Sequence, residues 1–140
     1  MTRWIENVAW EDVVHGWHTD MGDNAMLIRI GDPGSSFKTP KKQFKVILHY
    51  EFLDAEDADS FPEEAKISDT DAESIVGWLK YALENHMNVL VHCHAGICRS
   101  GAVVEVAEAM GFTPTDRFRL PNLRVKHKMM KALGWTYYSD

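Results

Sequence analysis

The stretch HCHAGICRSG, residues 92–101, places a thiol and a guanidinium at a spacing that could bind and attack an anion. Cys93 follows an apolar run, and Arg99 lies six positions later at the start of a predicted helix. The N-terminal end of a helix carries partial positive charge and free N–H groups, so an anion is favoured there. The planar donors of Arg99 match two oxygens of a phosphate group.

The same surroundings should activate the thiol. Helix N-termini and nearby cations lower the pKa of a cysteine from ~8.5 to between about 3.5 and 7.5. We therefore expect Cys93 to be a thiolate nucleophile that faces a bound phosphate. Gly96 permits a left-handed turn in the loop, and Ser100 is placed to donate its hydroxyl group to the sulfur. The candidate phosphate-binding residues are His94, Ala95, Gly96, Ile97, Cys98 and Arg99.

Strands and helices are predicted to alternate around this loop. Strand patterns cover 25–30, 43–52 and 87–93, helix patterns cover 70–85, 100–111 and 121–134, and a short helix is expected within 7–17. This alternation predicts an α/β fold that binds ligands at the carboxyl ends of its strands, and Cys93 sits at such an end. In 43–52, alternate positions form one apolar face, and Ile47 is expected to add to burial on the other. That face comprises Phe44, Val46, Leu48, Tyr50 and Phe52.

Smaller patterns refine the predicted helices. Thr70 and Glu73 have the spacing of a capping box that starts the helix over 70–85. Core positions at helical spacing in the last helix are Met129, Met130 and Leu133.

The composition is that of an ordinary soluble globular chain long enough for one domain. Of its 140 residues, 45% are apolar and 26% are charged. The net charge of −6 argues against nucleic-acid and anionic-membrane partners. The two cysteines do not form a disulfide scaffold, and a reducing cytoplasm is the simplest setting. Neither a signal peptide nor a membrane span is predicted from the apolar runs.

The stretch HCHAGICRSG fits the HC-x5-R-[ST] signature of cysteine-dependent protein tyrosine and dual-specificity phosphatases. The segments VILHYEFLD, AESIVGWLKYAL and PN also resemble the compact dual-specificity class, with its small prokaryotic and phage-type members the most similar. The resemblance implies one such domain over residues 1–140, with a central, mostly parallel sheet of about four or five strands flanked by helices. It also implies hydrolysis through a phosphocysteine intermediate. The first 25 residues have no clear counterpart in the family.

The resemblance also implies roles for residues outside the loop. A family general acid lies on a loop that follows a strand, and Asp54 after HYEFL matches this position best. Asp57 is the main alternative, and Asp59 shares the loop. His92 is expected to orient the backbone of the cysteine and to tune its thiol, and Asn122 to support the loop or to cap a helix.

The expected substrate is a phosphorylated protein or peptide. Phosphotyrosine is the first candidate, and phosphoserine and phosphothreonine are further ones. The lack of lysine between Cys93 and Arg99 disfavours highly charged inositol phosphates. We expect neither a cofactor nor a metal, because Arg99 and backbone donors would neutralise the phosphate. A monomer is expected.

Several other interpretations remain open. Cys98 and Asp116 would also suit the low-molecular-weight phosphatases, although these place the loop near the N-terminus. An arsenate-reductase-like redox enzyme and a non-catalytic phosphopeptide-binding module could use the same loop. A zinc site built from His92, Cys93, His94 and Cys98 is disfavoured, because neighbours on a strand point to opposite faces. Cys98 could also form a reversible disulfide with an oxidised Cys93.

Overall fold

A computed structural model describes residues 2–135 of the chain, so residue 1 and residues 136–140 of the predicted domain lie outside it. Five strands form one sheet in the order β3-β2-β4-β1-β5, and each pair of neighbouring strands is parallel. The α/β fold with a parallel sheet is therefore confirmed. The strands are β1 (Trp4–Ala9), β2 (Ala25–Gly31), β3 (Val46–Glu51), β4 (Asn88–Cys93) and β5 (Thr113–Pro114).

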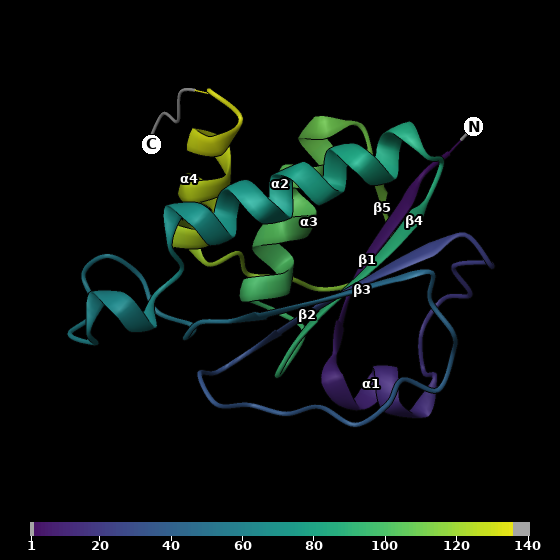
Figure 1. Ribbon diagram of the computed structural model, residues 1–140, viewed down its shortest axis with the longest axis horizontal. Coiled ribbons are helices and arrows are strands. Elements are labelled where there is room, and N and C mark those ends of the chain that lie inside the picture. Colours follow the sequence, from purple (N-terminus) through teal and green to yellow (C-terminus); the bar gives the residue numbers. More distant parts are fainter. Residues whose placement is uncertain (1, 136–140) are drawn as a thin grey trace.

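Helices cover the two faces of the sheet unequally (Figure 1). Three longer helices lie on one face, and α1 (Trp10–His15) with its neighbouring loops lies on the other. The longer helices are α2 (Asp69–Glu84), α3 (Arg99–Met110) and α4 (Leu123–Ala132), and a single 3-10 turn, η1 (Glu63–Ala65), precedes α2. The three helices predicted from residue 70 onward are confirmed, with boundaries shifted by a few residues.

The central strand β4 is buried on both faces, as its continuous apolar run predicts. Val89, Val91 and Cys93 pack in the core beneath the three longer helices, whereas Leu90 packs in a smaller core on the side of α1. Because β4 lies between β2 and β1, its last residue, Cys93, emerges at the middle of the carboxyl edge of the sheet.

The short helix expected within 7–17 is correct only for residues 10–15, since residues 7–9 belong to β1. β1 pairs with β4 from Ile5 opposite Val89 to Ala9 opposite Cys93, so the N-terminal residues supply an inner strand of the sheet. The strand pattern is obscured because β1 carries two buried polar residues, Glu6 and Asn7.

The prediction for 43–52 is wrong in three details: the bounds of the strand, the packing of Phe44 and the burial of Ile47. The strand itself spans only Val46–Glu51, and Phe44 packs against the smaller core beside α1 rather than with Leu48 and Tyr50. Ile47 is 50% exposed. β3 is an edge strand, so fewer elements cover it than cover the central strand β4, and Ile47 is left accessible.

The capping box predicted for Thr70 and Glu73 is also wrong, because α2 starts two residues earlier. Ser68 is the N-cap, and its Oγ accepts a hydrogen bond from the Asp71 backbone N–H at 3.0 Å. The Asp71 carboxylate accepts one in return from the backbone N–H of Ser68 at 3.4 Å. A capping box with Asp in place of Glu therefore starts the helix.

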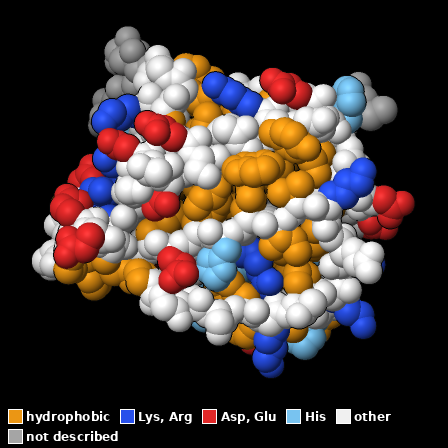
Figure 2. All heavy atoms as spheres, in the orientation of Figure 1, with side chains coloured by type: hydrophobic (Ala, Val, Ile, Leu, Met, Phe, Trp, Pro, Cys, Tyr) orange, Lys and Arg blue, Asp and Glu red, His pale blue; other side chains and the backbone are white. Residues whose placement is uncertain are grey.

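Hydrophobic side chains gather on the face of the molecule that carries α2 (Figure 2). Trp78 and Tyr81 contribute to this surface, and their ring centroids lie 5.3 Å apart in an edge-to-face arrangement. Within residues 2–135, no helix is long and apolar enough to cross a membrane.

Candidate active site

The loop between β4 and α3 wraps tightly against the end of β1. Gly96 has a φ of +74°, in the left-handed region that favours glycine. A Cβ atom added to Gly96 would lie 2.2 Å from the carbonyl carbon of Val8, so a side chain cannot fit. Asn7 of β1 donates from Nδ2 to the Gly96 carbonyl at 2.7 Å. The inner strand that sequence reasoning missed therefore fixes the shape of the loop.

The thiol of Cys93 lies at the beginning of α3. Its Sγ is 3.2 Å from Oγ of Ser100, which lies in the first turn of that helix. Both side chains are buried, with Cys93 only 3% exposed. The first N–H groups of a helix have no partner within it, so α3 presents partial positive charge close to the sulfur.

Arg99 is buried, and one of its nitrogens is already held. Nη1 donates to Oδ1 of Asp32 and to the backbone carbonyl of Phe52, both at 2.8 Å. Hydrogen bonds within residues 2–135 engage only this nitrogen of Arg99, so Nε and Nη2 form a pair of donors that a phosphate could take up.

Asp32 is a site residue that sequence reasoning missed. Its carbonyl accepts from the Ser35 N–H at 2.9 Å, which closes a turn after β2. The Gly34 N–H in this turn donates to the Glu51 carboxylate at 2.6 Å. The sequence signal was limited to the turn GDPGSS at the end of a predicted strand, and only the sheet order shows that this strand lies next to β4 and brings Asp32 to Arg99.

Asp54 is linked to the 93–99 loop through Asn122. Asn122 donates from Nδ2 to Oδ1 of Asp54 at 2.8 Å, and its backbone N–H donates to the Cys98 carbonyl at 3.0 Å. Its Oδ1 accepts the N–H of Val125 and caps α4. Asn122 therefore makes both of the contacts expected for it, with the loop region and with the helix end.

Asp57 and Asp59 are engaged elsewhere. Asp57 pairs at 2.8 Å with Nη1 of Arg124, a buried side chain that also contacts Glu63. The Asp59 carboxylate accepts the N–H of Glu56 within the acidic loop. Of the three candidate aspartates, Asp54 is the one that the structure brings to the loop.

Cys98 lies partly buried beside the aspartate. Burial, followed by the negative charge of Asp54, raises the pKa of the Cys98 thiol. Cys98 is therefore expected to remain protonated near neutral pH, and it does not compete with Cys93 as a nucleophile.

His92 faces the side of the sheet opposite Cys93, as the alternation of a strand predicts. Its Nε2 accepts a hydrogen bond from Nε of Arg29 at 2.9 Å, and its ring meets Phe37 edge-on with centroids 4.6 Å apart. Burial and the charge of Arg29 lower the pKa of His92 to about 3. The ring is therefore neutral, with its proton on Nδ1, because Arg29 always donates.

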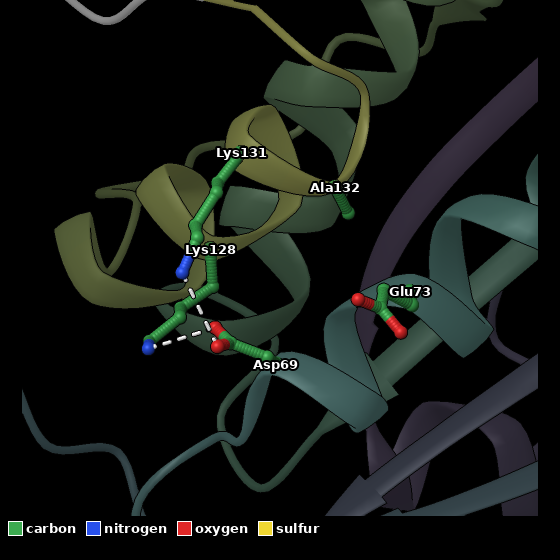
Figure 3. A pocket seen from close by; sticks show the side chains of 5 residues that line it. All are labelled: Asp69, Glu73, Lys128, Lys131 and Ala132. Atoms are coloured by element: carbon green, nitrogen blue, oxygen red, sulfur yellow. Dashed lines mark hydrogen bonds and ion pairs between the residues drawn. The ribbon is translucent and has the colours of Figure 1, made fainter.

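A pocket also lies away from this loop, where α2 meets α4 (Figure 3). Lys128 and Lys131 reach from α4 to the Asp69 carboxylate, with N···O distances of 2.9 and 3.2 Å. The hydrogen bond from Lys128, supported by Lys131, lowers the pKa of Asp69. These ion pairs connect α4 to α2. The described part of the chain also brings no three His, Cys, Asp or Glu side chains together as a metal site.

Neither a family model nor a curated protein matches this chain. Among solved structures, it is similar to a human tyrosine phosphatase-like serine/threonine/tyrosine-interacting protein at 17% identity and a TM-score of 0.47, covering 79% of this chain and 77% of that one. It is also similar to OH1 from the Orf virus, a tyrosine phosphatase, at 14% identity and a TM-score of 0.48, covering 94% and 88%. At such low identity, neither similarity assigns a function to this chain.

Proposed function

We propose that this protein is a phosphatase that hydrolyses phosphotyrosine monoesters through a phosphocysteine on Cys93. The observation that carries the proposal is the placement of a buried thiol 3.2 Å from Ser100, in a loop closed by Arg99, whose Nε and Nη2 have no hydrogen-bond partner within residues 2–135. Asp54 at the rim of the same loop supplies the acid that such a reaction needs.

In the first step, the Cys93 thiolate attacks phosphorus, and the bond from phosphorus to the substrate oxygen breaks. Protonated Asp54 gives its proton to that leaving oxygen. Arg99 and the loop N–H groups hold the phosphoryl oxygens and stabilise the charge of the transition state. The products of this step are the dephosphorylated substrate and the phosphocysteine.

In the second step, water attacks the phosphocysteine. The Asp54 carboxylate takes a proton from the water, the S–P bond breaks, and the electron pair returns to sulfur. A hydrogen bond from Ser100 stabilises the departing thiolate. Inorganic phosphate then leaves, with Cys93 again a thiolate and Asp54 again protonated.

The proposed substrate is a phosphorylated protein or peptide, with phosphoserine and phosphothreonine as secondary candidates. We also propose that residues 1–140 form one domain, and that the protein is monomeric and acts in the cytoplasm. The mechanism uses only groups of this chain, so it predicts activity without added cofactor.

Substitution of the nucleophile tests the function. Cys93→Ser should abolish turnover of p-nitrophenyl phosphate and keep phosphate affinity, because a hydroxyl group is not ionised near neutral pH. Arg99→Lys should also lose most activity, since an ammonium cannot form the two-pronged contact. A Cys93→Ser rate above about a tenth of wild type would contradict the mechanism, given the ~100-fold or larger effects usual for groups of this importance. Phosphopeptide binding without turnover by wild type would indicate a binding module instead.

A further inference from the structure

The segment that joins β5 to α4, residues 115–122, exposes apolar side chains to solvent and turns its charged ones toward the protein. Phe118 is 69% exposed and Leu120 is 60% exposed, whereas the arginines between and before them turn inward. Connecting segments usually expose charged side chains and bury large apolar ones. The reversal therefore calls for a physical explanation.

The arginines are held by carboxylates of the body of the protein. Arg117 contacts Glu6 and Asp12 at 3.5 Å each and donates to the Trp17 carbonyl at 3.0 Å. Arg119 donates to Glu105 of α3 at 2.9 Å. Their charges are thus paired internally.

A close approach to α3 fixes the segment further. A Cβ atom added to Gly101 would lie 2.8 Å from Cβ of Arg119, so a glycine at this position lets the segment pass against the first turn of α3 (Figure 1). With the arginines turned in, the alternation along the segment turns Phe118 and Leu120 outward.

The backbone of the segment is connected to the 93–99 loop by hydrogen bonds, one of them direct and the others through Asn7. Asn7 donates from one nitrogen, Nδ2, to the carbonyls of both Gly96 and Phe118, at 2.7 and 3.0 Å. The Leu120 N–H donates to the Ile97 carbonyl at 3.2 Å. The backbone that carries Phe118 and Leu120 is therefore attached to the outer side of the proposed phosphate-binding loop.

We infer that Phe118 and Leu120 form a docking surface for apolar side chains that flank the phosphotyrosine of a peptide substrate. This inference rests on the proposed function and adds which residues the site prefers beside the phosphotyrosine of its substrate. The segment adjoins the phosphate-binding loop through these hydrogen bonds, which places the surface within reach of residues that flank a phosphotyrosine bound there. Its own basic residues, Arg117 and Arg119, are paired with Glu6 and Glu105, so the surface offers little positive charge to an acidic flank.

The test measures binding rather than turnover, in the Cys93→Ser variant. Two phosphotyrosine peptides are compared, identical except that the residues next to the phosphotyrosine are Leu in one and Ser in the other. We expect the Leu peptide to bind about tenfold more tightly, consistent with partial burial of two apolar side chains. Adding Phe118→Ser and Leu120→Ser should remove this preference and leave the affinity for inorganic phosphate unchanged. Cys93→Ser with Ile47→Ser is the matched control, because Ile47 is 50% exposed on an edge strand of the sheet.

Equal affinities for the two peptides, with phosphate binding intact, would overturn the inference, and the proposed function would still stand on its turnover assay. A dimer in sedimentation that the Phe118→Ser and Leu120→Ser changes dissolve would assign the surface to a second copy and would also overturn it. Binding to neutral phosphatidylcholine vesicles that the same changes abolish would overturn it in favour of a membrane. Circular dichroism melting checks that each variant is folded.

Discussion

At the scale of single residues, Asn122 separates the candidate general acids. Its side chain holds Asp54, and its backbone N–H is bonded to the 93–99 loop. Asp57 faces the other way, toward the buried Arg124. The distinction rests on a partner about seventy residues away in sequence, which is why the spacing of carboxylates in the acidic loop left the choice open.

Asp54→Asn should slow hydrolysis of a phosphotyrosine peptide by roughly 100-fold. It should slow a substrate with a strongly acidic leaving group much less, because that group departs without a proton. Steady-state kinetics with both substrates measures the difference. Asp57→Asn is the matched control and should affect both substrates alike. If Asp57→Asn shows the dependence on the leaving group and Asp54→Asn does not, the assignment is reversed.

Cys98 allows a second prediction at this scale, concerning oxidation. A thiolate at Cys93 would be oxidised by peroxide to the sulfenic acid, which Cys98 could convert to a disulfide if the two Cα atoms come within ~7 Å. The raised pKa of the Cys98 thiol should make this step faster at alkaline pH, since only the thiolate attacks.

We expect peroxide inactivation that dithiothreitol reverses in the wild type, and more permanent loss in Cys98→Ser. Mass spectrometry should find a two-dalton loss linking the two cysteines. Equal rescue of both proteins, without that loss, would show that Cys98 only packs beneath the loop.

At the scale of elements, the start of α2 fixes the exit of the acidic loop that carries Asp54. Ser68→Ala should lower the free energy of unfolding by about 1 kcal/mol, because the Asp71 N–H then loses its partner. Thr70→Ala is the control and should change it by less than about 0.5 kcal/mol, as an exposed substitution away from a cap. Urea denaturation measures both. A larger loss of unfolding free energy for Thr70→Ala than for Ser68→Ala would instead support the capping box predicted from the sequence.

The elements that could be predicted from sequence are those in which the hydrophobic pattern of the residues indicates a single type of secondary structure. The run over 87–93 is apolar except at Asn88 and His92, and the helical stripe over 70–85 is apolar where it faces the core. β1 could not be predicted in this way. Its burial depends on Glu6 and Asn7 finding partners at Thr19 and Gly96, and no local pattern shows such pairing.

The site shows the same division. The residues from Cys93 to Ser100 are local in sequence, so their spacing predicts their arrangement. Asp32 and Asn7 reach the loop from neighbouring strands, and only the strand order brings them there. Sequence therefore identifies the groups proposed for the chemistry, and the fold adds those that hold them in place.

At the scale of the whole molecule, His92 connects the site to the stability of the sheet. It is fully buried on the central strand and faces Arg29 of β2, with Arg99 of α3 also contributing positive charge near it. Arg29 itself is buried, and its side chain donates to His92 and to the Lys38 carbonyl. A protonated His92 would add a charge beside these cations.

The fold should consequently lose stability in mild acid. The pKa of His92 is about 3 in the folded protein and ordinary, near 6.5, when unfolded. Between these values the unfolded chain binds a proton that the folded chain does not, so the free energy of unfolding falls as pH falls. From pH 7 to pH 5 this amounts to at most about 2 kcal/mol, taking ~1.4 kcal/mol per pH unit below the unfolded pKa.

His92→Gln removes the titration and keeps an acceptor within reach of Arg29. Urea denaturation at pH 7 and pH 5 should show a smaller loss of stability for this variant than for wild type, by up to about 2 kcal/mol. The size of the pH effect is the readout, because a change in packing alone shifts the stability of the variant equally at both pH values. An equal loss in wild type and His92→Gln would mean that His92 accepts a proton in the folded state, and the carboxylates would then account for the acid sensitivity.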